Sequence, residues 1–113
     1  MIYTLNLLAS IASAGFGVIA IINPSVLSHS SQVTNGERFY QRMYSARAVT
    51  WELLTGILPF YHVRGPAVAA VLATSATVQL ADVAIGLGRR DAGMAMGAFL
   101  AASVHAVCYW YTL

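Results

Sequence analysis

The chain has 113 residues, of which 58% are hydrophobic and only 9% are charged, with a formal net charge of +2 at pH 7. Soluble domains contain about 25% charged residues, so this composition is typical of an integral membrane protein, and its length allows one domain. The charge is too small and too scattered for a nucleic-acid interface. A single cysteine excludes an internal disulfide, and the spacing of cysteine and histidine offers no zinc motif.

The first predicted helix covers residues 3–22, a nearly unbroken apolar run that ends at Asn23 and Pro24. About 20 apolar residues span a bilayer as a helix, and proline is a natural stop. Small or weakly polar residues recur at steps of three or four positions, namely Asn6, Ser10, Ser13 and Gly17. This spacing predicts one helical face that packs against another membrane helix, and a buried Asn6 amide would need hydrogen-bond partners there.

Residues 25–38 form the only sizeable loop, and they are rich in polar, turn-forming side chains. The length of this loop would allow it to cover one membrane face as a lid. The second helix is expected at residues 37–61, where Glu37 near the start suits the helix dipole. Aromatic residues and arginines in its first turns resemble a membrane-interface belt. Pro59 is expected to kink the far end of this helix.

The third and fourth helices are expected at residues 66–87 and 92–112. A polar stripe follows one face of the third helix and contains Ser75, Gln79, Asp82 and Gly86. In the fourth helix, Gly93 and Gly97 form a Gly-x-x-x-Gly step, which lets another backbone approach closely. His105 continues the same face, so we expect it to point toward protein rather than lipid.

Four such helices predict an all-α, four-transmembrane-helix bundle, which a second copy of the chain could extend to a homodimer. The first and third loops then share one side of the membrane and carry Arg38, Arg42, Arg89 and Arg90. The other side carries only Arg64. The positive-inside rule therefore predicts that the first and third loops are cytoplasmic and that both termini are outside.

Four ionisable residues lie within the predicted spans: Arg47, Glu52, Asp82 and His105. An ionisable side chain in hydrocarbon costs roughly 2.5–3.5 kcal/mol on insertion scales, so such residues are by default functional hypotheses. A rise of about 1.5 Å per residue places Arg47 and Asp82 at matching depths near the cytoplasmic side. The same estimate places Glu52 and His105 deeper, near the midplane, with Gln79 between the two layers.

The second helix carries polar residues on two flanks. One flank contains Gln41, Ser45, Glu52 and Thr55, and the other contains Tyr40, Tyr44, Arg47 and Trp51. The helix is therefore either enclosed on both flanks or borders a wide cavity open to one face. Each residue also has a purely structural interpretation: an Arg47–Asp82 salt bridge that fixes helix register, a hydrogen-bonded Glu52, and an interhelical hydrogen bond from His105.

Between Arg47 and His105 the chain resembles a family of small four-helix membrane proteins of bacteria and fungi that is catalogued only as a domain of unknown function. The resemblance covers residues 39–113 and is carried by Arg47, Gly56, the Arg64-Gly65 turn, Asp82, a glycine-rich turn and His105. It implies a membrane fold and no established activity. Glu52 lies outside the shared pattern.

The preferred hypothesis is an enzyme that performs non-redox acid/base chemistry on a lipophilic small molecule within the bilayer, such as isomerisation, cyclisation or epoxide opening. Glu52 or Asp82 could act as general acid, and His105 as base or proton shuttle. Arg47 could hold a carboxylate or stabilise an oxyanion. The predicted substrate-binding residues are Tyr44, Trp51, Gln79, Tyr40 and Asn6. We expect no cofactor and no metal, because the sequence contains no nucleotide loop, nucleophile elbow or metal-ligand spacing.

Two alternatives remain open. The chain could be an accessory subunit of a membrane complex that docks through the glycine face of its fourth helix. It could also be a small proton-coupled transporter that needs a dimer to form a pathway, since intramembrane carboxylates and histidines form proton relays. The enzyme hypothesis is preferred because four ionisable groups on three helices exceed what packing requires.

Overall fold

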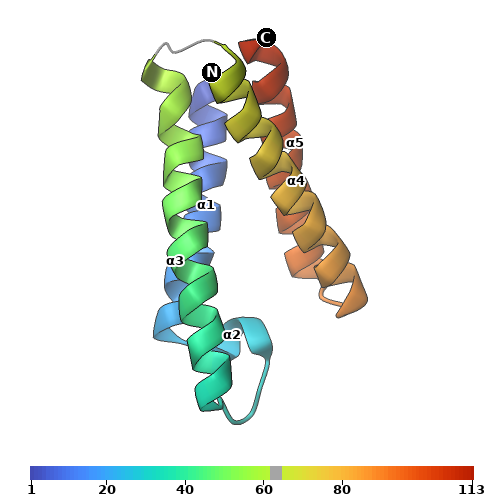
Figure 1. The fold of residues 1–113 in the computed structure, drawn as a ribbon. Helices are drawn as coiled ribbons and strands as arrows, with labels where there is room; N and C mark the ends of the chain where they lie inside the picture. Colours follow the sequence, from blue (N-terminus) through green and yellow to red (C-terminus); the bar gives the residue numbers. More distant parts are fainter. Residues whose placement is uncertain (62–64) are drawn as a thin grey trace.

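The computed structural model describes residues 1–61 and 65–113, and all regular elements in this part of the chain are helices (Figure 1). There are four long helices, α1 (Ile2–Ile22), α3 (Asn35–Ile57), α4 (Pro66–Gly88) and α5 (Ala92–Thr112), with a short α2 (Ser25–Ser28) and a 3-10 turn η1 (Leu58–Tyr61). The four helices expected from the sequence are therefore present, each within a few residues of its predicted bounds. Arg64, which entered the charge count and the family pattern, lies outside the described residues.

The two ends of α3 follow from local chemistry. At its start, the Thr34 hydroxyl accepts the Glu37 N–H and the Glu37 carboxylate accepts the Thr34 N–H, each at 3.1 Å, which makes a capping box. This cap places the start of the helix at Asn35, two positions before the predicted one. At the other end the α-helix gives way to η1 around Pro59, which lacks the N–H that an α-helical bond requires.

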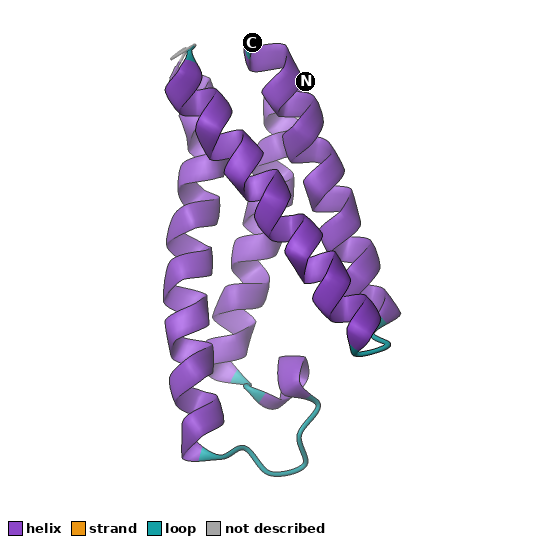
Figure 2. Ribbon diagram, turned by 45° about the vertical axis from the view of Figure 1, so that its right-hand side comes forward, coloured by secondary structure: helices purple, strands orange, loops and turns teal. Residues whose placement is uncertain are grey.

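The long helices form two antiparallel pairs, α1 with α3 and α4 with α5. Figures 1 and 2 show that the pairs lie together at the end that holds both termini and diverge toward the end that holds α2. The loop around α2 and the turn between α4 and α5 lie at this second end, which confirms that the first and third loops share a side.

The small-residue face predicted for α1 is confirmed, because Asn6, Ser10 and Gly17 are all buried. The face packs against α3 at very short range. A Cβ atom added to Gly56 would lie 2.9 Å from the Ser10 Cβ, so only glycine allows this approach of the two helices. Close backbone approach through small residues is the usual way in which membrane helices pack.

The α4–α5 pair uses a different glycine from the one that the sequence suggested. A Cβ on Gly86 would lie 2.8 Å from the Ala95 backbone nitrogen, so Gly86 sets the close contact next to the turn. Gly97 has no atom of another element within 4 Å of its Cβ position and is exposed. The expectation of a contact through Gly93 and Gly97 is therefore wrong within this chain, because the helix pairs have already diverged there, although His105 on the same face is fully buried.

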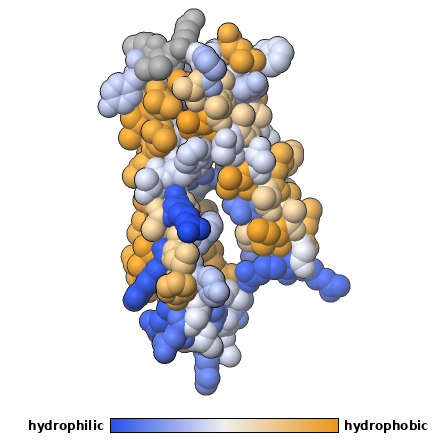
Figure 3. Space-filling view, in the orientation of Figure 1, coloured by the Kyte–Doolittle hydropathy of each residue, from blue (hydrophilic) through white to orange (hydrophobic). Residues whose placement is uncertain are grey.

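The outer surface is that of a membrane protein. Three helices, α1, α4 and α5, are each long and apolar enough to cross a bilayer. Large apolar side chains point outward along them, including Leu8, Phe16, Leu80, Phe99 and Trp110. Figure 3 shows hydrophilic atoms gathered at the α2 end of the molecule. The helix α3 has a similar length, but it is not among the three apolar spans and carries five charged residues, Glu37, Arg38, Arg42, Arg47 and Glu52.

The α2 loop is tied to the α4–α5 turn. Arg89 Nη2 donates to the Ser28 carbonyl at 3.1 Å, and His29 Nε2 lies 3.2 Å from the Asp91 carboxylate. Asp91 also accepts the Met94 N–H at 2.9 Å and so caps α5. The hydrogen bond from the Met94 N–H lowers the pKa of Asp91 most, and the hydrogen bond from His29 lowers it further. The loop thus connects the two helix pairs where they diverge.

Candidate functional site

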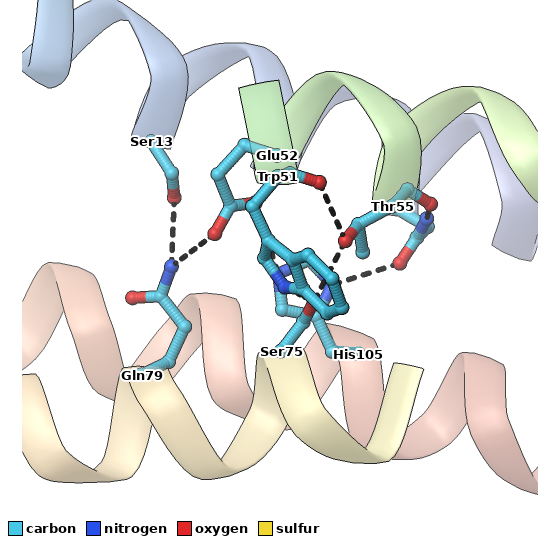
Figure 4. A network of polar contacts seen from close by, with 8 residues as sticks. Ser13, Trp51, Glu52, Thr55, Ser75, Gln79 and His105 are labelled. Carbon is cyan, nitrogen blue, oxygen red and sulfur yellow. Dashed lines mark hydrogen bonds and ion pairs between the residues drawn. The ribbon is translucent and has the colours of Figure 1, made fainter. Parts of the chain in front are cut away.

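A layer of polar side chains crosses the centre of the bundle, and every long helix contributes to it (Figure 4). The contributors are Asn6 and Ser13 from α1, Trp51, Glu52 and Thr55 from α3, Ser75 and Gln79 from α4, and His105 from α5. All except Ser13 and Trp51 are buried. Because a buried polar group without a partner is costly, these contacts restrict how the helices can be arranged.

The network begins with a carbonyl that the helix itself cannot satisfy. The Thr55 carbonyl would normally accept the N–H of residue 59, but residue 59 is proline. The Asn6 side chain supplies the missing donor, since its Nδ2 lies 2.8 Å from the Thr55 oxygen. Asn6 is fully buried, so the pairing joins α1 to α3 at a point where α3 loses its α-helical hydrogen bond.

This contact also determines the protonation of His105. Because Asn6 donates through Nδ2 to a carbonyl, its Oδ1 must be the atom that faces His105 Nδ1, at 2.8 Å. An amide oxygen only accepts, so His105 Nδ1 carries the proton. In the neutral imidazole the lone pair is then on Nε2, the nitrogen that faces Glu52. Pro59 therefore acts through Thr55 and Asn6 to direct the basic atom of His105 toward the carboxyl group.

Glu52 is held at one oxygen and free at the other. Its Oε1 accepts from Gln79 Nε2 at 3.0 Å, and the same amide nitrogen donates to the Ser13 hydroxyl at 3.1 Å. Its Oε2 lies 3.7 Å from His105 Nε2, and neither atom has a hydrogen-bond partner among the described residues. Proton transfer needs about 2.6–3.2 Å, and catalytic hydrogen bonds are often longer than this before substrate binds. A small side-chain movement would bring the two atoms into range.

A second branch of the network fixes Trp51. The indole N–H donates to the Ser75 hydroxyl at 2.7 Å. Thr55 donates its hydroxyl proton to the Trp51 carbonyl at 2.9 Å, so Ser75 is the donor in the 2.7 Å contact between the two hydroxyls. This chain of bonds joins α3 to α4 and holds the indole in one orientation.

A cleft of about 640 Å³ opens between α3 and α4 beside this network. Figure 3 shows the hollow between the two helix pairs. Its lining is largely apolar but includes charged and aromatic residues: Ser13, Tyr40, Met43, Tyr44, Arg47, Ala48, Trp51, Glu52, Thr74, Val78, Gln79 and Asp82. This size and mixed character suit a small lipophilic molecule with a few polar groups. Glu52 belongs both to the cleft wall and to the buried network.

Most of the site residues predicted from the sequence meet at this cleft. Seven of them line it: Arg47, Glu52, Asp82, Tyr40, Tyr44, Trp51 and Gln79. His105 and Asn6 do not line the cleft and lie behind Glu52, fully buried. Asn6 was expected to bind substrate, but its amide is engaged by Thr55 and His105 instead. The sequence left two arrangements for the second helix, enclosure on both flanks or a wide cavity open to one face. In the structure α3 borders an open cavity.

The expected ion pair between Arg47 and Asp82 is not formed. Both residues line the cleft, on opposite walls, yet neither has an ion-pair or hydrogen-bond partner among the described residues. The divergence of the helix pairs separates α3 from α4 where these two residues lie. Arg47 also borders a second hollow of about 500 Å³ on the outer side of α3, with Thr50 and Leu54.

Ser13, Ser75 and Thr55 were expected on polar helix faces but without a functional role, and the structure includes all three in the network. The role of Pro59 was also missed. The signal for it is in the sequence, since a proline four positions after Thr55 leaves the Thr55 carbonyl in need of a donor from outside the helix. Within residues 1–61 and 65–113, no group of three or more histidine, cysteine, aspartate or glutamate side chains converges to hold a metal ion.

Comparisons with known proteins match this chain to no family model, no curated protein and no solved structure. The site is therefore interpreted from its own geometry.

Proposed function

We propose that this chain is a membrane-embedded enzyme that performs non-redox acid/base chemistry on a lipophilic small molecule bound in the cleft between α3 and α4. The observation that carries the proposal is the position of Glu52, which lines the cleft and also lies 3.7 Å from the basic nitrogen of a fully buried His105. A carboxyl group with an open side toward a cavity and a proton-exchange partner behind it is suited to delivering and recovering a proton.

In the proposed membrane arrangement, α3 is the fourth span. Its support is the antiparallel packing with α1, an apolar span of similar length, and the exposed apolar residues Leu53, Leu54 and Ile57 in its second half. Its charged first turns lie at the end where hydrophilic residues gather. Under the positive-inside rule, the arginines at this end support a cytoplasmic position for the α2 loop and the α4–α5 turn.

The proposed mechanism assigns one task to each group. Glu52 gives a proton to the substrate from the cleft wall, and Gln79 holds the carboxyl group in position through Oε1. Before substrate binds, His105 can hold this proton on Nε2, from which it passes to Glu52 Oε2. Asp82, on the opposite wall, accepts the proton that the substrate loses and returns it through water in the cleft to Glu52 after the product leaves, which restores the starting state. One proton enters the substrate and one leaves it, which matches an isomerisation or a cyclisation without any change of oxidation state.

The test is a comparison of product profiles in proteoliposomes. A lipid-soluble extract of the source cells is incubated with the wild-type protein and with Glu52→Gln, and mass spectrometry follows new species of unchanged mass or with one added water. We expect the variant to lower the rate by about 10²–10⁴, the usual contribution of a general acid. Thr77→Val is the matched control, because Thr77 is exposed on α4 and its hydroxyl bonds only within that helix.

The same variants separate the alternatives. Equal product formation by the wild-type protein and Glu52→Gln would overturn the enzyme proposal. Proton-coupled uptake of a solute that is lost in Glu52→Gln, without any new product, would support a transporter instead. Co-purification with a fixed membrane partner that is lost when Gly97 is replaced would support an accessory subunit, because Gly97 is exposed.

A further inference from the structure

Arg47 and Asp82 form an unusual pair of charges. They lie on opposite walls of one largely apolar cleft, and neither has an ion-pair or hydrogen-bond partner among the described residues. A guanidinium group cannot lose its charge in a protein, so an arginine at this depth requires either water or an anion. The space between the two walls, about 640 Å³ for the whole cleft, is large enough for the anion to belong to a bound molecule.

We propose that the ligand of this cleft is a lipophilic carboxylic acid, whose carboxylate is held by Arg47 and whose chain extends along α3 toward Glu52. The inference rests on the proposed function, because it names the class of substrate for the same site. Arginine binds a carboxylate through two parallel N–H···O bonds, which fix the orientation of the group as well as its place. The apolar wall from Ala48 and Val78 then receives the hydrocarbon part.

The spacing along α3 predicts which part of the ligand would react. Glu52 lies five positions after Arg47, which corresponds to about 7.5 Å along the helix. A chain anchored by its carboxylate at Arg47 therefore presents to Glu52 an atom roughly half a dozen bonds away. Trp51 lies between the two positions on the same helix, and its indole is fixed by Ser75, so it forms a rigid wall for this part of the chain.

The charges in the cleft favour a carboxylate over a phosphate. The lining contains one arginine and the carboxylate of Asp82, while Glu52 carries the proton that it gives to the substrate. A second negative charge on the ligand would therefore meet repulsion from Asp82 rather than a second cation. A phosphate monoester carries a charge of about −1.5 to −2 at neutral pH, whereas a carboxylate carries only one.

The proposal can be tested by binding alone. The protein has two tryptophans, so replacing Trp110, which is exposed near the C-terminus, leaves Trp51 as the only tryptophan. The Trp110→Phe protein is placed in phosphatidylcholine nanodiscs at mildly alkaline pH. It is titrated with 6-bromoundecanoic acid, the corresponding 6-bromo alcohol and the corresponding 6-bromoalkyl phosphate. Bromine quenches tryptophan that it contacts, and the sixth carbon lies at about the level of Trp51 when the carboxylate is at Arg47. We expect the acid to quench at about ten- to hundredfold lower concentration than the alcohol.

Three variants in the same background decide the outcome. Arg47→Gln should lose the preference for the acid, whereas Arg42→Gln should keep it, because Arg42 does not line the cleft. Glu52→Gln should also keep it, so a failure of carboxylate binding is distinguishable from a failure of the proposed chemistry. Equal quenching by acid and alcohol, stronger quenching by the phosphate, or an acid preference that survives Arg47→Gln would each overturn the inference.

Discussion

The contact between Asn6 and the Thr55 carbonyl gives a prediction that depends on Pro59. Asn6→Ala removes two hydrogen bonds of 2.8 Å, and it leaves both the Thr55 carbonyl and His105 Nδ1 without partners in a fully buried place. Interhelical hydrogen bonds in membrane proteins contribute about 0.6 kcal/mol on average and at most about 1.7. We therefore expect Asn6→Ala to lower the free energy of unfolding by about 1–3 kcal/mol.

Pro59→Ala should reduce that cost. An alanine at this position has an N–H that can bond to the Thr55 carbonyl within the helix, so Asn6→Ala would then leave only His105 without its partner. The double-mutant cycle should show a coupling energy of about 0.5–1.5 kcal/mol between Asn6 and Pro59, although the two side chains carry no complementary groups. The assay is unfolding in mixed micelles by added dodecyl sulfate, followed by far-ultraviolet circular dichroism.

Ser10→Ala is the matched control. Ser10 lies one turn from Asn6 on the same buried face, but its hydroxyl has no hydrogen-bond partner among the described residues. Its replacement should therefore leave the unfolding free energy within about 0.5 kcal/mol of wild type. If Asn6→Ala costs the same free energy with and without Pro59, the argument that the proline creates the need for Asn6 is wrong.

Two further predictions concern the α2 end of the molecule. Gly86→Ala should destabilise the α4–α5 pair by about 1–3 kcal/mol, because its Cβ would lie 2.8 Å from the Ala95 backbone nitrogen. Gly97→Ala should be neutral or stabilising, since its Cβ would meet no atom of another element within 4 Å among the described residues. Thermal unfolding of both variants tests this, and a larger loss of stability in Gly97→Ala would contradict it. The lowered pKa of Asp91 means that its contribution to stability is present above its unfolded pKa and is lost as the pH falls through its folded pKa. Hydrogen exchange should therefore show reduced protection of residues 25–30 below about pH 4, and Asp91→Ala should show it already at neutral pH; unchanged protection in both cases would mean that the tie to His29 does not hold the loop.

Helix positions and inward faces were predictable because they depend on local patterns. The apolar runs, the proline after the first helix and the proline at the start of α4 mark the bounds of the spans. The steps of three and four positions that connect Asn6 with Gly17, and Ser75 with Gly86, select the faces that are buried in the structure. Such patterns require only the period of the helix.

The pairing of residues across helices was less predictable, because it depends on how the helices cross. Equal depth suggested a pair between Arg47 and Asp82, but depth says nothing about the divergence of the two helix pairs that opens the cleft. Equal depth also matched Glu52 with His105, and this pair is close because the helices still lie together at that level. Gly93 and Gly97 make no close contact with another helix in the described part of the chain for the same reason, since they lie where the helix pairs have separated.

The central claim is that Glu52 transfers protons to a lipophilic molecule in the cleft. The most direct measurement is the product profile of a lipid-soluble extract after incubation with proteoliposomes that contain either the wild-type protein or Glu52→Gln, at equal amounts of folded protein. We expect a product of unchanged mass, or with one added water, that forms with the wild-type protein and whose rate of formation falls by about 10²–10⁴ with the variant. A wild-type profile identical to that of empty liposomes, or a product that forms equally with Glu52→Gln, would contradict it.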